Sequence, residues 1–139
     1  MAIKEVHAIP ARQQSERYTK PSDREIIQQS TVYFQFDLYE PTKTEMAKIE
    51  LLSETLINDL SLRVEIDGHT DIQGSSEYNF GLSQARADFI RKYFIQKGIG
   101  SERITIVSFG EKRLEKSCDE NCTSAIHKLN RRAEIILYR

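Results

Sequence analysis

The fold is decided by residues 62–97, which read LRVEIDGHTDIQGSSEYNFGLSQARADFIRKYFIQK. Over residues 62–66 apolar side chains alternate with polar ones, which predicts a strand, and Gly68 is expected to end it. Polar residues 69–76 then form a loop, and the rest of the stretch predicts a helix over residues 77–97. The segment therefore places a polar loop between the end of a strand and the start of a helix.

The flanking segments extend this pattern in both directions. Apolar alternation predicts further strands, and apolar residues at helical spacing, opened by a capping box at Thr42–Glu45, predict a second helix. The predicted strands lie near residues 32–36, 62–66, 104–107 and 133–137, and the predicted helices cover residues 43–59 and 77–97. This β-α-β-α-β-β order predicts an α+β fold, a two-layer sandwich with the helices packed on one face of a mixed sheet.

Length and composition indicate one folded domain. The 139 residues fit a single domain, and 39% hydrophobic residues are enough for one core. We expect an N-terminal extension or linker at residues 1–28, with one short element near Ile26 and Ile27, and the domain at residues 29–139. The formal net charge of -1 gives no global attraction to nucleic acid or an anionic membrane, so local groups must hold any charged ligand.

The sequence contains no run of about 18 apolar residues that could span a membrane. Its first residues also lack the apolar core of a secretory signal peptide. We therefore expect either a cytosolic protein or one whose export signal is not part of this sequence.

Arg86 has an unexpected position in the predicted helix. At about 100° per residue, the stripe expected to face the core contains Leu82, Ala85, Phe89, Ile90 and Tyr93. Arg86 falls inside this stripe, where a guanidinium is costly unless it is paired or reaches a ligand. Periodicity alone favours a structural arginine, which either snorkels to the helix edge or pairs with an internal carboxylate.

Asp71 lies in the loop just before this helix, for which Ser75 and Ser76 are candidate caps. Loops at strand ends commonly carry functional residues, and a carboxylate near a helix N-terminus is stabilised. The alternative is an Asx-type turn, in which Asp71 accepts a hydrogen bond from its own backbone. The residues alone leave both interpretations open.

Motifs of common enzymes are absent from the sequence. There is no H-E-x-x-H, no G-x-S-x-G and no glycine-rich phosphate loop. We expect His69 to be a hydrogen-bonding loop residue or a core residue rather than a metal ligand. Arg131 and Arg132 are too few for a nucleic-acid footprint. We therefore expect no catalytic residues, no metal, no cofactor and no nucleic-acid partner.

Several short motifs follow one another along residues 30–139. They are Phe36-Asp37, Ile66–Asp71, Gly74, Tyr78-Asn79, Leu82–Ala87, Gly98-Ile99, Arg103-Ile104, Phe109–Glu111 and Asn130–Glu134. In this order and spacing they resemble the OmpA-like C-terminal domain, a family that includes outer-membrane protein tails, peptidoglycan-associated lipoproteins and flagellar-motor stator subunits. The most specific part is G-H-T-D followed by Y-N-x-x-L-S-x-x-R-A.

The resemblance implies non-covalent, non-enzymatic binding of peptidoglycan through the diaminopimelate residue of its stem peptide. It implies that Asp71 and Arg86 carry the contact. It also implies that five further residues line the pocket, namely Asp37, Thr70, Asn79, Leu82 and Arg131. Diaminopimelate ends in an ammonium and a carboxylate, so Asp71 can accept from the ammonium and Arg86 can bind the carboxylate with two hydrogen bonds. On this reading Arg86 faces a pocket.

The resemblance also implies a place in the cell and alternative functions. We expect a periplasmic domain associated with the outer membrane, attached through a region outside this sequence and anchoring it to the cell wall. Peptidoglycan and other envelope proteins are the expected partners. The main alternative is an envelope protein-protein interaction scaffold of the peptidoglycan-associated lipoprotein type, and a cell-wall hydrolase is a third and weaker hypothesis.

Cys118 and Cys122 lie four positions apart in the polar stretch before the last strand. In an exported family we expect a disulfide between them rather than free thiols. With His127 they would make an incomplete zinc set, which is the less favoured interpretation. A disulfide would fix this loop beside Asn130 and Arg131.

Overall fold

A computed structural model describes residues 23–118 and 122–139 of the chain. The elements are β1 (Ile26–Tyr33), α2 (Lys43–Asn58), β2 (Arg63–His69), α3 (Ser76–Gln96), the 3₁₀ turn η1 (Ser101–Arg103), β3 (Ile104–Gly110), α4 (Ser124–Asn130) and β4 (Arg132–Tyr138). Of the extension predicted at residues 1–28, residues 1–22 lie outside the described residues. No helix in the described ranges is long and apolar enough to cross a membrane.

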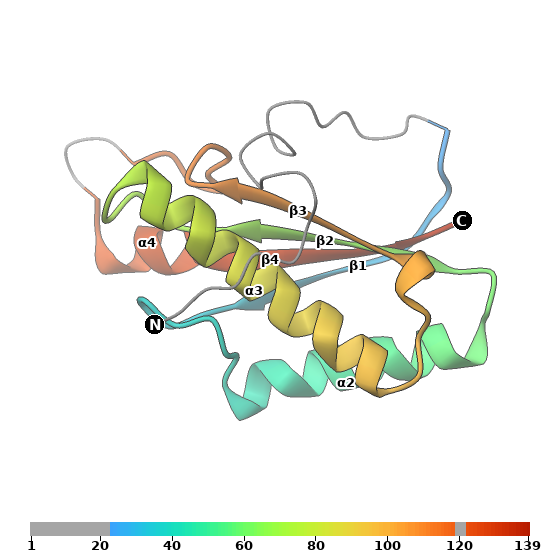
Figure 1. Cartoon of the computed structure of the whole chain (residues 1–139). Coiled ribbons are helices and arrows are strands. Elements are labelled where there is room, and N and C mark those ends of the chain that lie inside the picture. Colours follow the sequence, from blue (N-terminus) through green and yellow to red (C-terminus); the bar gives the residue numbers. More distant parts are fainter. Residues whose placement is uncertain (1–22, 119–121) are drawn as a thin grey trace.

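The four strands form one mixed sheet in the order β1-β4-β2-β3 (Figure 1). β4 runs antiparallel to both of its neighbours, whereas β2 and β3 are parallel. Helices α2 and α3 pack on the same face of this sheet. Their buried side chains and those of the strands form one hydrophobic cluster. The predicted fold class, an α+β sandwich with helices on one face of a mixed sheet, is confirmed.

The core-facing stripe of α3 differs in phase from the predicted one. Its buried positions include Phe80, Ser83, Ala87, Ile90 and Phe94, which follow helical spacing and lie over β2 and β3. The predicted stripe is therefore only partly right: Leu82 and Ile90 are buried, whereas Ala85, Phe89 and Tyr93 are half-buried. Arg86 lies at the edge of the observed stripe and is still fully buried.

Gly68 lies where the backbone of α3 packs closely against β2, at Ser83. It does not end β2, as predicted, but lies within the strand and pairs with both neighbouring strands. A Cβ on residue 68 would lie 2.8 Å from the carbonyl carbon of Ser83 and nearer still to its oxygen. Glycine thus allows the backbone of α3 to approach β2 closely, and this approach positions the first half of the helix.

β1 lies earlier in the sequence than the strand predicted near residues 32–36. It starts at Ile26 and pairs with β4 up to Tyr33, which lies opposite Arg132, the first residue of β4. Beyond Tyr33 no partner residues of β4 remain, so the chain leaves the sheet. It turns at Asp37, which has a φ of 60°.

The polar stretch before β4 contains a helix that the apolar pattern does not reveal. α4 is only seven residues long, and its N-cap Thr123 accepts a hydrogen bond from the backbone of Ile126. The last residue of α4, Asn130, is fully buried. Its side chain accepts from the backbone N–H groups of Glu115 and Lys116. This buried amide fixes the loop beside the start of β4.

Candidate functional site

A pocket of about 360 Å³ lies where the loops after β1 and β2, the first half of α3 and the start of β4 meet. It is lined by Phe36, Asp37, Thr70, Asp71, Gln73, Gly74, Tyr78, Asn79, Leu82, Arg86 and Arg131. All seven residues predicted for the site are in this list. The structure therefore brings together, around one cavity, side chains that span residues 36 to 131 of the sequence.

Arg86 is fully buried and is bonded by backbone groups. Its Nε donates to the carbonyl of Leu38 at 2.8 Å, Nη1 to that of His69 at 3.0 Å, and Nη2 to that of Gln35 at 3.3 Å. The guanidinium also lies 5.0 Å from the centre of the Phe34 ring. It neither snorkels to solvent nor forms an ion pair with a carboxylate of the described residues, so both predicted structural roles are wrong.

The charge of Arg86 is maintained despite its burial. Burial lowers the pKa of Arg86 to about 10, and Arg131 acts in the same direction, whereas Asp71 and Asp37 oppose the shift. A value near 10 still leaves the guanidinium protonated at pH 7. The pocket therefore contains a cation that backbone dipoles hold in place and that no bonded carboxylate of the described residues neutralises.

Asp71 forms the Asx-type turn that the sequence left open, and it also lines the pocket. Its Oδ1 accepts from the backbone N–H of Gln73 at 3.0 Å, and Oδ2 accepts from the Gln73 side chain at 2.9 Å. Arg131 Nη1 donates to the same Oδ2 at 3.3 Å. These donors fix the orientation of the carboxylate, so the turn and the site are the same feature rather than alternatives.

Neighbouring polar groups hold the loop that carries Asp71. The Thr70 hydroxyl donates to the carbonyl of Asp71 at 2.9 Å, and the Thr70 N–H donates to the carbonyl of Gly110 at 2.8 Å. Asn79 Nδ2 donates to Glu111 at 2.9 Å and lies 3.4 Å from the carbonyl of Asp71. Both Thr70 and Asn79 are buried, and their contacts make the loop geometry rigid.

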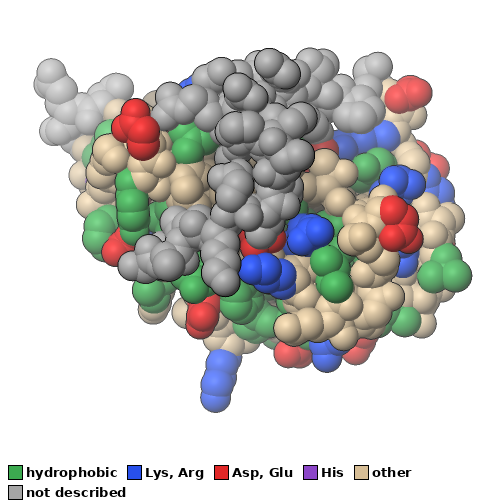
Figure 2. Space-filling model, viewed as in Figure 1, with side chains coloured by type: hydrophobic (Ala, Val, Ile, Leu, Met, Phe, Trp, Pro, Cys, Tyr) green, Lys and Arg blue, Asp and Glu red, His purple; other side chains and the backbone are tan. Residues whose placement is uncertain are grey.

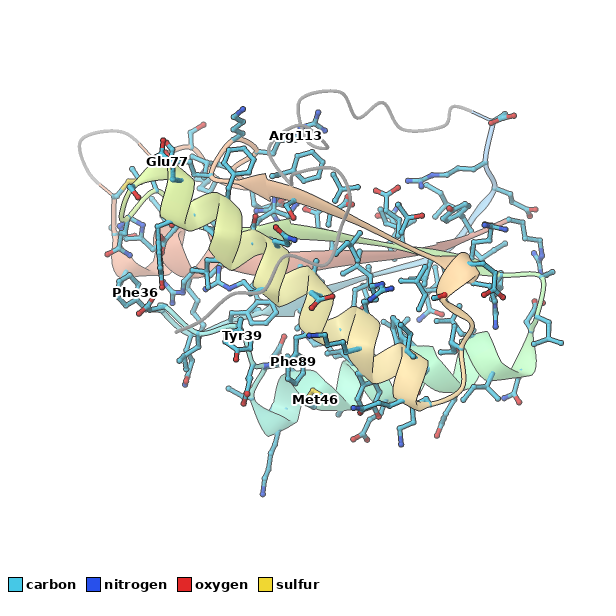
Figure 3. All side chains as sticks on the ribbon, viewed as in Figure 1. Phe36, Tyr39, Met46, Glu77, Phe89 and Arg113 are labelled. Carbon is cyan, nitrogen blue, oxygen red and sulfur yellow. A yellow bond between two sulfur atoms is a disulfide. The ribbon has the colours of Figure 1, made fainter. Side chains whose placement is uncertain are left out.

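Asp37 and Tyr78 join the two sides of the pocket. The Tyr78 hydroxyl donates to Asp37 Oδ1, and this bond to the nearby carboxylate raises the pKa of Tyr78. The loop that carries Asp37 is held over α3, because Tyr39 packs edge-on against Phe89 with the ring centres 6.4 Å apart (Figure 3). Phe36 in the same loop is exposed and lies at the pocket.

Four lining residues were not predicted as site residues: Phe36, Gln73, Gly74 and Tyr78. The spacing could have indicated Tyr78, because Tyr78, Leu82 and Arg86 recur at every fourth position and so share a helix face. Gln73 gives no such signal, since its contact with Asp71 depends on the turn geometry. On the face shown in Figure 2, acidic and basic side chains are interspersed, in keeping with the net charge of -1.

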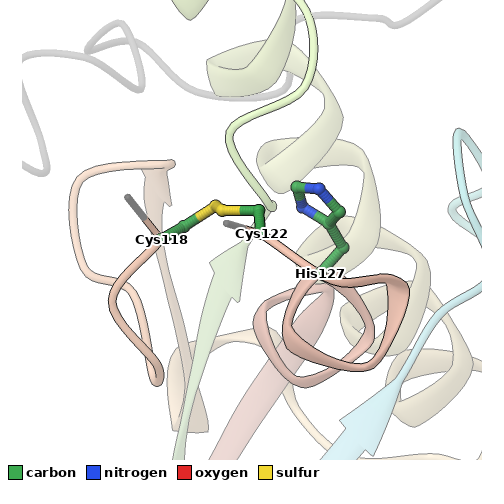
Figure 4. Close-up of side chains that lie close together, drawn as sticks. All are labelled: Cys118, Cys122 and His127. Carbon is green, nitrogen blue, oxygen red and sulfur yellow. A yellow bond between two sulfur atoms is a disulfide. The ribbon is translucent and has the colours of Figure 1, made fainter. Parts of the chain in front are cut away.

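The cysteines and His127 lie beside the pocket rather than in its lining. Cys118 and Cys122 form a disulfide, as expected, with a Cα–Cα distance of 5.2 Å. The ring of His127 lies next to it (Figure 4). Its Nδ1 is 4.0 Å from Asp71 Oδ2, so this histidine of α4 lies close to both the disulfide and a pocket residue. His69 is a buried core residue, stacked on Phe109 at 5.0 Å.

Comparison with known proteins assigns the family. The family model described as the OmpA family matches residues 33–126, which is more than half of the chain and includes all pocket residues except Arg131. The chain belongs to the OmpA family.

Members of the OmpA family with similar sequences include lipoproteins and a porin. The peptidoglycan-associated lipoprotein of Haemophilus influenzae is 35% identical over 104 residues, 75% of this chain and 66% of that protein. The lipoprotein of the same name from Buchnera aphidicola is 33% identical, over 77% of this chain and 60% of that protein. Outer membrane porin F of Pseudomonas fluorescens is 34% identical, over 74% of this chain and 31% of the porin. The matched part therefore spans less than two thirds of each of these relatives.

Solved structures agree with this assignment. The peptidoglycan-associated lipoprotein from Burkholderia pseudomallei superposes with a TM-score of 0.68 at 32% identity, over 78% of this chain and 89% of that one. The C-terminal domain of MotB from Helicobacter pylori has a TM-score of 0.67 at 19% identity, over 78% of this chain and 83% of that one. At 19% identity, the similarity to the MotB domain shows a shared fold and nothing more.

Proposed function

We propose that this OmpA-family chain binds peptidoglycan non-covalently through the diaminopimelate residue of its stem peptide. In this role it anchors the outer membrane or an envelope protein to the cell wall. The observation that carries the proposal is the convergence of Asp71 and Arg86, both buried and charged, on one pocket. The names of the lipoprotein relatives support the coarser part, association with peptidoglycan.

The pocket chemistry supports a zwitterionic ligand end. The lining holds two carboxylates, Asp37 and Asp71, and two guanidinium groups, Arg86 and Arg131. A side chain that ends in both an ammonium and a carboxylate can interact with one group of each sign, whereas a singly charged ligand would also lie close to two groups of its own sign. Diaminopimelate has such an end.

Arg86 has donors to spare for a carboxylate. A guanidinium carries five N–H donors, and three of them are used by backbone carbonyls, which leaves two. A ligand carboxylate can accept both, and each charge-assisted bond contributes roughly 1.5–3 kcal/mol. The three carbonyl bonds fix the guanidinium beforehand, so little conformational entropy is lost when the ligand binds.

Asp71 is suited to the ligand ammonium for a related reason. Gln73 and Arg131 hold its carboxylate in one orientation, and an ionised carboxylate has about four acceptor positions, of which three are occupied. One acceptor position therefore remains for an N–H donor of the ligand. Asn79, Thr70 and Leu82 then shape the walls, while Asp37 lies across the pocket with Tyr78.

The proposal includes no catalysis and places the domain in the periplasm, associated with the outer membrane. A single binding site of this kind would be weak, but many sites on one cell-wall polymer increase the overall avidity. If the fold instead served mainly as a scaffold for another envelope protein, the pocket would not determine binding to the cell wall.

Co-sedimentation with purified sacculi tests the proposal. We expect the wild-type chain to sediment with sacculi that contain diaminopimelate and Asp71→Asn to remain in the supernatant. Glu54→Gln, which removes the same charge at an exposed position of α2, should bind like the wild type. Equal sedimentation of all three proteins would refute the pocket assignment and favour the scaffold. Release of soluble muropeptides would indicate a hydrolase.

A further inference from the structure

The disulfide and His127 form a group of three potential metal ligands beside the pocket (Figure 4). The sulfur atoms of Cys118 and Cys122 and one ring nitrogen of His127 all lie within 4.8 Å of one another. Their side chains are half-buried, and His127 lies in α4, which begins two residues after Cys122. While the disulfide is intact, neither sulfur is a thiolate, so the group cannot bind a metal through sulfur.

We propose that reduction of the Cys118–Cys122 disulfide converts this group into a Zn²⁺ site with Cys118, Cys122 and His127 as ligands. Each disulfide takes two electrons and two protons from a thiol reductant, which itself becomes a disulfide, and yields two thiols. Zn²⁺ then displaces one proton from each thiol and binds the two thiolates and the neutral imidazole. This site does not depend on the peptidoglycan proposal.

The distances support tetrahedral coordination after a small adjustment. Zinc bonds sulfur at about 2.3 Å and imidazole nitrogen at about 2.0–2.1 Å, so its ligand atoms lie roughly 3.5–3.8 Å apart. The three atoms are already within 4.8 Å of one another, and reduction allows the two sulfurs to separate.

Asp71 places a negative charge beside the proposed site. Its Oδ2 lies 4.0 Å from His127 Nδ1, and that buried nitrogen has no hydrogen-bond partner in the described part of the chain. A carboxylate at this distance attracts a cation bound by the histidine. Asp71 already accepts bonds from Gln73 and Arg131, so we assign it this electrostatic role and leave the fourth zinc position to water.

The other group of clustered donors in the described residues is less suited to a cation. It consists of Asp67, His69 and Glu134 on the sheet. Arg132 Nε donates to Glu134 Oε2 at 2.7 Å, so a guanidinium already neutralises the carboxylate and opposes a second positive charge. Beside the cysteine group the nearest described ion pair is that of Asp71 with Arg131, in which the carboxylate lies toward His127.

Metal binding to the reduced and oxidised chain tests the proposal. The protein is reduced with a dithiol, the dithiol is removed by gel filtration without oxygen, and bound metal is measured after dialysis against Zn²⁺. We expect one Zn²⁺ per reduced chain and none per oxidised chain. Co²⁺ in place of Zn²⁺ should give a thiolate-to-metal charge-transfer band in the reduced protein only.

Substitutions separate the site from adventitious binding. The double variant Cys118→Ser, Cys122→Ser and the variant His127→Gln should lose the tight Zn²⁺, whereas Lys128→Gln on the exposed side of α4 should retain it. Asp71→Asn should weaken the affinity for Zn²⁺, because it removes a negative charge beside the site. Equal Zn²⁺ in reduced and oxidised protein, or in the double serine variant and the wild type, would overturn the proposal. Because no peptidoglycan is present, this outcome does not bear on the proposed function.

Discussion

Gly68→Ala should destabilise the domain through a collision between two backbones. The added Cβ would lie 2.8 Å from the carbonyl carbon of Ser83 in α3, whereas non-bonded carbon atoms prefer about 3.5 Å or more. The helix must therefore retreat by about 0.7 Å or more, and it would lose packing along its whole buried stripe. Overpacking typically costs 1–3 kcal/mol, and because neither backbone can rotate away we expect about 3 kcal/mol.

Gly98→Ala provides the matched control for this prediction. Gly98 has a φ of 97°, and a Cβ there would meet no atom within 4 Å, so only backbone strain of about 1 kcal/mol is added. With a urea m-value of about 1.5 kcal/mol/M, the unfolding midpoint should fall by about 2 M in Gly68→Ala and by about 0.7 M in Gly98→Ala. A Gly68→Ala midpoint equal to or above that of Gly98→Ala would refute the argument that close backbone approach positions α3.

Three further predictions concern stability. Arg86→Ala should lower the free energy of unfolding by about 3 kcal/mol or more, because three carbonyl groups lose their donor and a cavity remains, and urea denaturation beside the surface variant Arg91→Ala measures this. An Arg86→Ala protein as stable as the wild type would contradict it. The pKa of Tyr78 is raised above 10.0 in the folded state, so its bond to Asp37 contributes stability that is fully present below pH 10 and is lost as the pH rises through the raised value. The stability difference between wild type and Tyr78→Phe should accordingly shrink above pH 10, and a difference that grows there would be inconsistent with this bond. Reduction of the Cys118–Cys122 disulfide in the presence of a chelator should lower the free energy of unfolding by about 2 kcal/mol, since the loop that the disulfide closes is short. An unchanged urea midpoint would argue against that contribution.

The sequence predicted the parts of the fold that depend on local periodicity. The alternation in β2 and the helical spacing in α3 were sufficient for the layer architecture, because both elements bury one continuous face. The start of β1 could not be predicted in this way. Its first residues are exposed, and its end is set by where β4 begins rather than by its own pattern. α4 was missed because its seven residues are mostly polar and bury only Asn130.

The seven residues predicted for the site all line one pocket, but four other lining residues and the hydrogen bonds were not predicted. Helical phase marked Arg86 as misplaced, the loop before the helix drew attention to Asp71, and the family resemblance supplied the other five predicted residues. The sequence could not indicate that three backbone carbonyls bind Arg86, because two of them belong to the loop after β1, far away in the chain. The approach of His127 to Asp71 likewise joins residues that are far apart in the chain.

A calorimetric titration with two soluble stem peptides tests the central claim most directly. One peptide carries diaminopimelate, and the other carries lysine, which has the side-chain ammonium but lacks the carboxylate. Loss of the bonds between that carboxylate and Arg86 should weaken binding by at least about 10-fold, since each bond contributes roughly 1.5–3 kcal/mol. We predict that the wild type prefers the diaminopimelate peptide by this factor and that Asp71→Asn binds neither peptide. Equal affinity of the wild type for both peptides would contradict the account.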